Sequence, residues 1–140
     1  MNVVTAWGGN KKRRELAERV VNFCIAELMP RMRTLDICVE ITNDCPNCGY
    51  CLAVNPREFV IEVKNCKDDL EFIETICHEM VHVKQGARKE LLDISLTLKK
   101  WKGKEWITIF SDIEDYFNFP WEKEAYTLES VLTKKFLGIE

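Results

Sequence analysis

The chain's only two histidines stand four residues apart, in the run His78-Glu79-Met80-Val81-His82. If the run is helical, both imidazoles lie on one face, about one turn apart, and can reach the same metal ion. Glu79 follows the first histidine, so its carboxylate can accept a proton from a metal-bound water. Zinc lowers the pKa of such a water to about 7, which makes hydroxide available at neutral pH. The pattern predicts a zinc site suited to hydrolysis.

The alternative interpretation is a pair of helical histidines that only pack or face water. Two histidines scattered at random would show this spacing roughly once or twice in a hundred sequences, and a glutamate at the second position cuts that by roughly another factor of ten. The spacing therefore favours the zinc site.

A catalytic zinc usually has three protein ligands and an open position. Because the chain has no third histidine, we expect the third ligand to be a carboxylate from another segment. The best candidate segment is residues 120–126 (PWEKEAY), at the start of a predicted last helix. On a helical wheel Glu122 and Glu124 flank the core side of that helix, and periodicity alone leaves both open.

The combination of HExxH on one helix and Glu-x-x-Ala on a second resembles the gluzincin pattern of zinc metallopeptidases. In that family the glutamate three residues before the alanine is the third ligand, which implies Glu122, with Ala125 matching. Several gluzincins have Asp four residues after the ligand, where this chain has Tyr126. Tyr126 is a candidate for stabilising the reaction's oxyanion or bonding a ligand, or it is simply a partly buried aromatic. Glu129 is a further candidate for supporting a zinc ligand.

The resemblance extends over residues 49–126. The zinc-ligand pattern resembles that of minigluzincins and of ImmA/IrrE-type peptidases. Four further segments are similar to small SprT-like proteins of phages and bacteria: residues 57–59 (REF), 83–85 (VKQ), 101–104 (WKGK) and 120–126. It implies one zincin-like metallopeptidase domain over residues 1–140, with Zn²⁺ as cofactor and a peptide or protein as substrate. In such enzymes the substrate commonly lies along an edge strand.

The chain has seven cysteines, and Cys45-Pro46-Asn47-Cys48-Gly49 has the form of a metal knuckle. A structural zinc held by four thiolates is a second prediction, and free thiols or a redox-sensitive pair are the alternatives. Cys24 and Cys77 fall on apolar helix faces and are expected in the core. The candidate thiol ligands of the structural zinc are Cys45, Cys48, Cys51 and Cys66, with Cys38 as a substitute.

Three long helices are predicted. Asn10 is a plausible N-cap for a first helix to about Met29, and Asp68 caps the helix that carries the histidines and extends to about residue 86. A last helix starts near Pro120, since proline is favoured in a first turn, and ends before Gly138.

Alternating apolar and polar residues predict strands over 35–42, 50–54 and 58–64, which would make a small antiparallel meander. For residues 87–117 we predict either a hairpin with a turn at 102–104 or, nearly as well supported, a helix over 89–100. The expected fold class is α+β and zincin-like: an N-terminal helix, a small antiparallel sheet, the HExxH helix, and a C-terminal helix carrying the third zinc ligand.

Composition limits the possible partners. The net charge of −3 argues against nucleic acid as a partner, and charged residues at 31% with no long apolar run argue against a membrane span. The N-terminal residues do not resemble a secretory signal, so we expect a cytoplasmic protein, in the host cytoplasm if it is phage-encoded. The alternative function is a non-catalytic zinc-binding scaffold for a protein or nucleic-acid partner. The intact Glu79 favours the enzyme, because metal binding alone does not need it.

Overall fold

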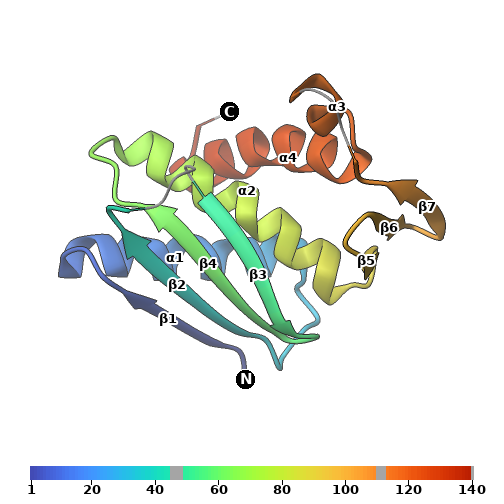
Figure 1. The fold of residues 1–140 in the computed structure, drawn as a ribbon. Coiled ribbons are helices and arrows are strands. Elements are labelled where there is room, and N and C mark those ends of the chain that lie inside the picture. Colours follow the sequence, from blue (N-terminus) through green and yellow to red (C-terminus); the bar gives the residue numbers. More distant parts are fainter. Residues whose placement is uncertain (45–48, 110–112, 140) are drawn as a thin grey trace.

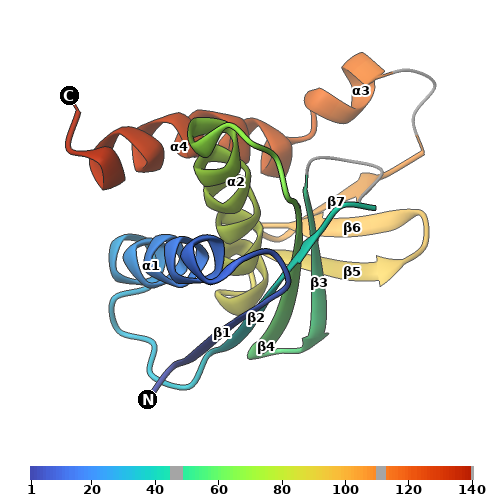
Figure 2. The same ribbon diagram turned by 90° about the vertical axis from the view of Figure 1, so that its left-hand side faces the viewer.

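The computed structural model describes residues 1–44, 49–109 and 113–139. Four strands form a mixed sheet, and helices cover one of its faces (Figure 1 and Figure 2). A second sheet of three short antiparallel strands projects at the side. The predicted α+β class is confirmed.

The three long helices begin and end where the capping signals predict. Asn10 caps α1 (Lys11–Leu28): its side chain accepts a backbone N–H three residues on, at 2.8 Å. Asp68 caps α2 (Asp69–Ala87) through a similar bond of 2.9 Å. Helix α4 (Pro120–Leu137) has proline in its first turn. Because these signals are local, the sequence alone was sufficient to predict them.

The main sheet has the strand order β1-β2-β4-β3. Strand β2 pairs with β4 in parallel, and β3 pairs with β4 antiparallel at the edge. The predicted antiparallel pairing of the strands over 50–54 and 58–64 is confirmed, but the strand over 35–42 pairs in parallel with β4 instead of antiparallel with β3, so the predicted meander is wrong at that strand. Parallel pairing lets β2 and β4 lie side by side in the centre, where every second side chain is buried, and leaves the more exposed β3 outside. The bounds are β1 Val3–Trp7, β2 Asp36–Thr42, β3 Gly49–Asn55 and β4 Glu58–Lys64.

Strand β1 was not predicted. It pairs in parallel with β2, on the side away from β4. Its side chains are partly or fully exposed, including Trp7, so it lacks the apolar alternation that marks a half-buried strand.

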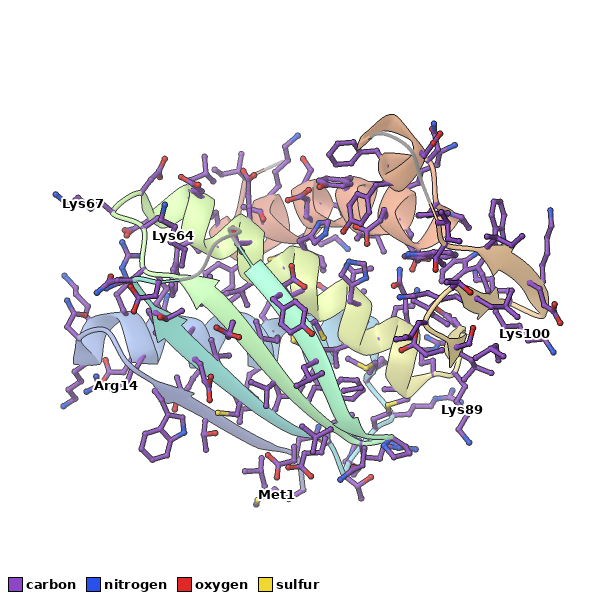
Figure 3. All side chains as sticks on the ribbon, in the orientation of Figure 1. Met1, Arg14, Lys64, Lys67, Lys89 and Lys100 are labelled. Atoms are coloured by element: carbon purple, nitrogen blue, oxygen red, sulfur yellow. The ribbon has the colours of Figure 1, made fainter. Side chains whose placement is uncertain are left out.

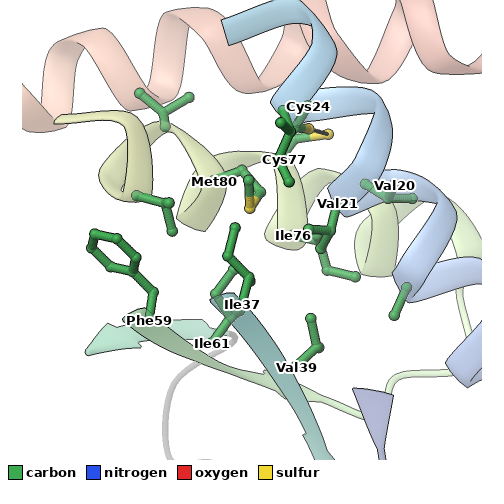
Figure 4. Close-up of a cluster of buried hydrophobic side chains, with 14 of the residues drawn as sticks. Val20, Val21, Cys24, Ile37, Val39, Phe59, Ile61, Ile76, Cys77 and Met80 are labelled. Atoms are coloured by element: carbon green, nitrogen blue, oxygen red, sulfur yellow. Dashed lines mark hydrogen bonds between the residues drawn. The ribbon is translucent and has the colours of Figure 1, made fainter. Parts of the chain in front are cut away.

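The core lies between the sheet and the helices α1 and α2 (Figure 4). Burial of each large apolar side chain contributes about 1.5–3 kcal/mol to folding. Cys24 and Cys77 are buried within this core, as predicted, with their sulfur atoms 3.8 Å apart. Helix α4 packs on α2, so α2 is held between the sheet and α4. Central members of the core are Val20, Val21, Ile37, Val39, Phe59, Ile61, Ile76 and Met80.

The small sheet consists of β5 (Leu91–Ser95), β6 (Leu98–Trp101) and β7 (Lys104–Ile107). The hairpin alternative for this region is therefore right, and the helix over 89–100 is wrong. Lys102 and Gly103 have φ values of 48° and 89°, the left-handed pair that a tight two-residue hairpin turn requires.

Trp121 of α4 attaches the small sheet to the body. Its ring stacks on Phe119 at 4.7 Å and lies 6.3 Å and 6.2 Å from the rings of Trp101 and Trp106. A short helix, α3 (Ile113–Phe117), precedes α4.

Most charged side chains lie at the periphery, and Glu79, Lys84 and Glu122 are the buried exceptions among the described residues. Lys64, Lys67, Lys89, Lys100 and Arg14 point away from the body (Figure 3). Within the described residues, none of the helices combines the length and apolar character needed to cross a bilayer.

Candidate metal centre

Helix α2 carries both histidines and Glu79 towards α4. The side chains of His78 and His82 are 12% and 16% exposed, and their ring centroids lie 5.0 Å apart. Residues on the opposite face of the helix, such as Ile76 and Met80, are fully buried in the core. Core packing therefore fixes the rotation of α2 and with it the direction of the imidazoles.

Helix α4 brings Glu122 against the two histidines. Its Oε1 lies 3.4 Å from His78 Nε2, and its Oε2 lies 3.3 Å from His82 Nε2. Glu122 is 4% exposed. In the part of the chain that the structure describes, these three residues form the one cluster of three or more potential ligands, with ligand atoms within 4.8 Å of one another.

The geometry of this cluster fits a small cation. A tetrahedral zinc with bonds of about 2.0–2.2 Å separates its ligand atoms by about 3.3–3.6 Å. One donor atom from each of the three residues lies within 4.8 Å of the others, so small side-chain adjustments would bring all three to one ion. Glu122 Oε1 is buried, and His78 Nε2 lies 3.4 Å from it, at the long end of hydrogen-bond distances. A buried carboxylate oxygen in that position is costly unless something binds it. The donor set, two imidazoles and a carboxylate, is one that zinc uses at catalytic sites.

The electrostatics of the cluster also favour positive charge. Burial lowers the pKa of His78, but hydrogen bonds to Glu122 and Glu129, together with the negative charges of Glu79 and Glu122, more than offset this and raise it to about 9. Burial raises the pKa of Glu122, and bonds to the two histidines outweigh it, lowering the value to about 2. A site that binds a proton this firmly between carboxylates also attracts a metal cation.

Glu79 lies beside the cluster in a different environment. It is 7% exposed, and burial raises the pKa of its carboxyl despite the partly opposing effect of the two histidines. Gly49 of β3 passes so close that a Cβ there would lie 3.1 Å from Glu79 Oε2. The absence of a side chain at Gly49 therefore leaves room for the glutamate.

A cavity of about 440 Å³ opens over these residues. The start of β3 forms one wall, and Trp121, Phe119 and strands of the small sheet form another. Both histidines, Glu79 and Glu122 line it. The cavity thus places the candidate metal ligands and the candidate base against a common space next to the edge strand.

Glu124, the other candidate third ligand, lies elsewhere. Its Oε1 bonds Lys84 Nζ at 2.9 Å and Gln85 Nε2 at 3.0 Å. These bonds outweigh the effect of burial and lower the pKa of Glu124. Of the two glutamates that the helical wheel left open, Glu122 is the one that lies against both histidines.

Tyr126 and Glu129 both contact His78. The Tyr126 ring centroid lies 4.6 Å from the His78 ring, and Tyr126 is 44% exposed. Glu129 Oε1 lies 3.5 Å from His78 Nδ1, on the side of the ring opposite Glu122. Both residues are therefore placed to orient His78.

Sequence reasoning missed Tyr116 of α3. It lines the cavity, and its pKa is raised by burial and by the charge of Glu122, with which it also forms a hydrogen bond. The preceding residues carry no clear pattern, and a five-residue helix leaves too little periodicity to place a side chain.

Of the four cysteines predicted to hold a structural zinc, Cys45 and Cys48 lie outside the described residues, so that site stays a prediction. Cys51 lines the cavity, and burial together with the charge of Glu79 raises the pKa of its thiol to about 12. Cys66 follows β4, with its sulfur 3.7 Å from the carbonyl oxygen of Asp68. Cys38 lies in β2, between the inward-facing Ile37 and Val39.

Comparison with protein families, with curated proteins and with solved structures found no match for this chain. Functional inference therefore rests on the chemistry of the site.

Proposed function

We propose that this protein is a zinc-dependent metallopeptidase of the gluzincin type, with His78, His82 and Glu122 as metal ligands and Glu79 as general base. The observation that carries the proposal is the convergence of these four side chains on one cavity, although they come from separate helices. Metal binding alone needs only three of them. A fourth, buried carboxylate beside the ligands is what hydrolysis requires.

Zinc bound here would lower the pKa of a coordinated water to about 7 and polarise the carbonyl to be attacked. Glu79 would accept the proton of the attacking water and then deliver it to the leaving amine nitrogen. Burial supports this role, because it raises the proton affinity of the carboxylate. Tyr126 and Tyr116 are the candidate donors to the developing oxyanion, since both lie beside the ligand cluster.

A peptide is the substrate that best suits the surroundings. Strand β3 is an edge strand of the main sheet, and its first residues border the cavity. An extended peptide could add to this edge through backbone hydrogen bonds, which would hold a peptide bond over the ligands. The main-chain pairing would be independent of substrate sequence.

Zinc content and proteolysis together test the proposal. We expect about one zinc per chain by elemental mass spectrometry, lost in Glu122→Ala and retained in the control Glu15→Ala, whose glutamate is exposed on α1. Unfolded casein should be cleaved, with cleavage lost on chelation and restored by zinc. Absence of zinc from protein never exposed to chelator would contradict the proposal. Zinc without cleavage of any peptide would instead favour the non-catalytic scaffold.

A further inference from the structure

Gln85 is the one fully buried amide side chain in the part of the chain that the structure describes, and it lies directly behind His82. Its Oε1 is 2.8 Å from His82 Nδ1. Its Nε2 donates to the backbone carbonyl of Trp121 at 2.9 Å and to the Glu124 carboxylate at 3.0 Å. The amide therefore joins α2, which carries His82, to the first turn of α4, which carries the third candidate ligand.

These partners determine which way the amide points. A backbone carbonyl and an ionised carboxylate can only accept hydrogen bonds, so both must face the NH₂ group of Gln85. The oxygen of the amide is then the atom that faces His82. An amide oxygen only accepts, so the hydrogen in this contact has to sit on His82 Nδ1.

The tautomer of His82 follows. With its hydrogen on Nδ1, the neutral imidazole has its free lone pair on Nε2. Nε2 is the atom that lies 3.3 Å from Glu122 Oε2, on the side where the ligand cluster converges. With a cation in the site, the Gln85 bond would therefore hold His82 in the tautomer whose Nε2 lone pair is free to bind it.

Glu124 is itself held in place. Lys84 Nζ contacts Glu124 Oε1 at 2.9 Å and Glu90 Oε1 at 2.9 Å. Lys84 is 8% exposed, so these ion pairs are largely shielded from solvent. The lysine ammonium can only donate, so Glu124 Oε1 is the acceptor in its contact with Lys84 and lies ready to accept from the Gln85 amide as well.

We propose that Gln85 is a positioning residue of the metal centre, presetting His82 as the Nδ1–H tautomer, and that Glu124 sets the orientation of the Gln85 amide. This inference rests on the proposed function only in taking His82 as a metal ligand. Glu124 would then act on the metal ligand His82 indirectly, through its hydrogen bond with Gln85.

The first test is metal affinity in Gln85→Met, which removes both polar atoms and keeps most of the side-chain volume. Competition with a chromogenic chelator should show zinc bound about 10- to 100-fold more weakly than in the wild type. The control is Arg13→Met, which removes an ion pair to Asp69 and bonds to the carbonyls of Cys66 and Lys67 at the other end of α2. It should lower the melting temperature while leaving zinc affinity unchanged.

An exchange of the two side chains separates positioning from packing. Gln85→Glu alone places two carboxylates together, whereas Gln85→Glu with Glu124→Gln restores a donor opposite an acceptor. The double variant should bind zinc more tightly than Gln85→Glu and give a Co²⁺ absorption spectrum closer to that of the wild type. Equal affinity in the wild type and Gln85→Met would overturn the inference.

The tautomer can be read without metal or activity. Because the chain has two histidines, the imidazole ¹⁵N resonances of the metal-free protein at alkaline pH are few and assignable. Glu122→Ala removes the carboxylate that faces His82 Nε2 and would compete for the hydrogen. In that variant we expect the hydrogen of His82 on Nδ1, and a mixture of tautomers when Gln85→Met is added. A hydrogen on Nε2 in Glu122→Ala would contradict the inference. Failure of the wild type to bind zinc would instead refute the proposed function.

Discussion

Glu79 and Glu122 are glutamates in one cavity, but their surroundings push their proton affinities in opposite directions. Two imidazoles lower the pKa of Glu122 to about 2, whereas burial raises the pKa of Glu79. A carboxyl that stays ionised suits a metal ligand, and one with raised proton affinity suits a base. In the proposed mechanism Glu122 would therefore serve as a metal ligand and Glu79 as the base, a difference that the residue type alone does not predict.

Glu79→Gln tests this division. The amide keeps the size of the side chain but cannot accept a proton, so we expect about one zinc per chain and a fall in kcat of about 10²- to 10⁴-fold. Casein cleavage and elemental analysis on the same preparation provide the measurement. Full activity in this variant would exclude Glu79 as the base.

Gly49→Ala tests the close approach of β3. The added Cβ would lie 2.5 Å from Thr75 Cγ2 and 3.1 Å from Glu79 Oε2, so the strand or the glutamate must move. We expect a loss of about 1–3 kcal/mol in the free energy of unfolding and a fall in kcat of up to about 100-fold from the displaced base.

Val54→Ala is the matched control for that variant, because it changes an exposed side chain on the same strand. Val54→Ala should change neither the free energy of unfolding nor kcat appreciably. Urea unfolding and casein kinetics compare the two variants, and wild-type behaviour in Gly49→Ala would show that the site tolerates the extra atom.

The sequence predicted His78, Glu79 and His82 because one helical turn suffices to relate them. The choice between Glu122 and Glu124 could not be made in the same way. It depends on Lys84 and Gln85, which engage Glu124 from the neighbouring helix. The apolar periodicity of one helix does not predict which residues of a neighbouring helix its side chains will contact.

At the level of elements, the sequence predicted helix ends well and sheet order poorly. Caps such as Asp68 act within one turn, so they can be read locally. The parallel pairing of β2 with β4 depends on a connection that passes through β3, and the alternation of each strand is the same in either arrangement. The parallel pairing and the antiparallel meander can therefore be told apart only in the folded structure.

Asp68→Ala tests whether the helix start and the metal site are independent. Loss of the N-cap bond to Leu70 should cost about 1 kcal/mol in the free energy of unfolding. Because the histidines lie more than two turns further along α2, zinc affinity should not change. Urea unfolding and chelator competition provide the two measurements, and a drop in affinity would mean that fraying reaches the site.

On the scale of the whole molecule, Trp121 connects three parts. Its ring packs against the small sheet through Trp101 and Trp106, its carbonyl accepts from Gln85, and Glu122 follows it. The small sheet also contributes to the cavity wall. The side chain of Trp121 therefore contributes both to the attachment of this sheet and to the wall of the cavity.

Trp121→Ala should cost about 3–5 kcal/mol in the free energy of unfolding, because a large buried ring is removed. Since the bond to Gln85 comes from the backbone, we expect zinc affinity to change much less than in Gln85→Met. Amide hydrogen exchange should increase most in β5–β7. Unchanged protection of those strands would show that the small sheet is held by other contacts.

Strand β3 borders the cavity, and in the described part of the chain no further strand pairs with its outer side. Tyr50, Leu52 and Val54 along it are about half exposed. An open edge of this kind does not distinguish a foreign peptide from an unfolded stretch of another copy of the same protein. If a peptide adds to β3 as proposed, self-association would compete with it for the same backbone groups. A short extended peptide that resists cleavage would then act as an inhibitor and would also keep concentrated protein from aggregating.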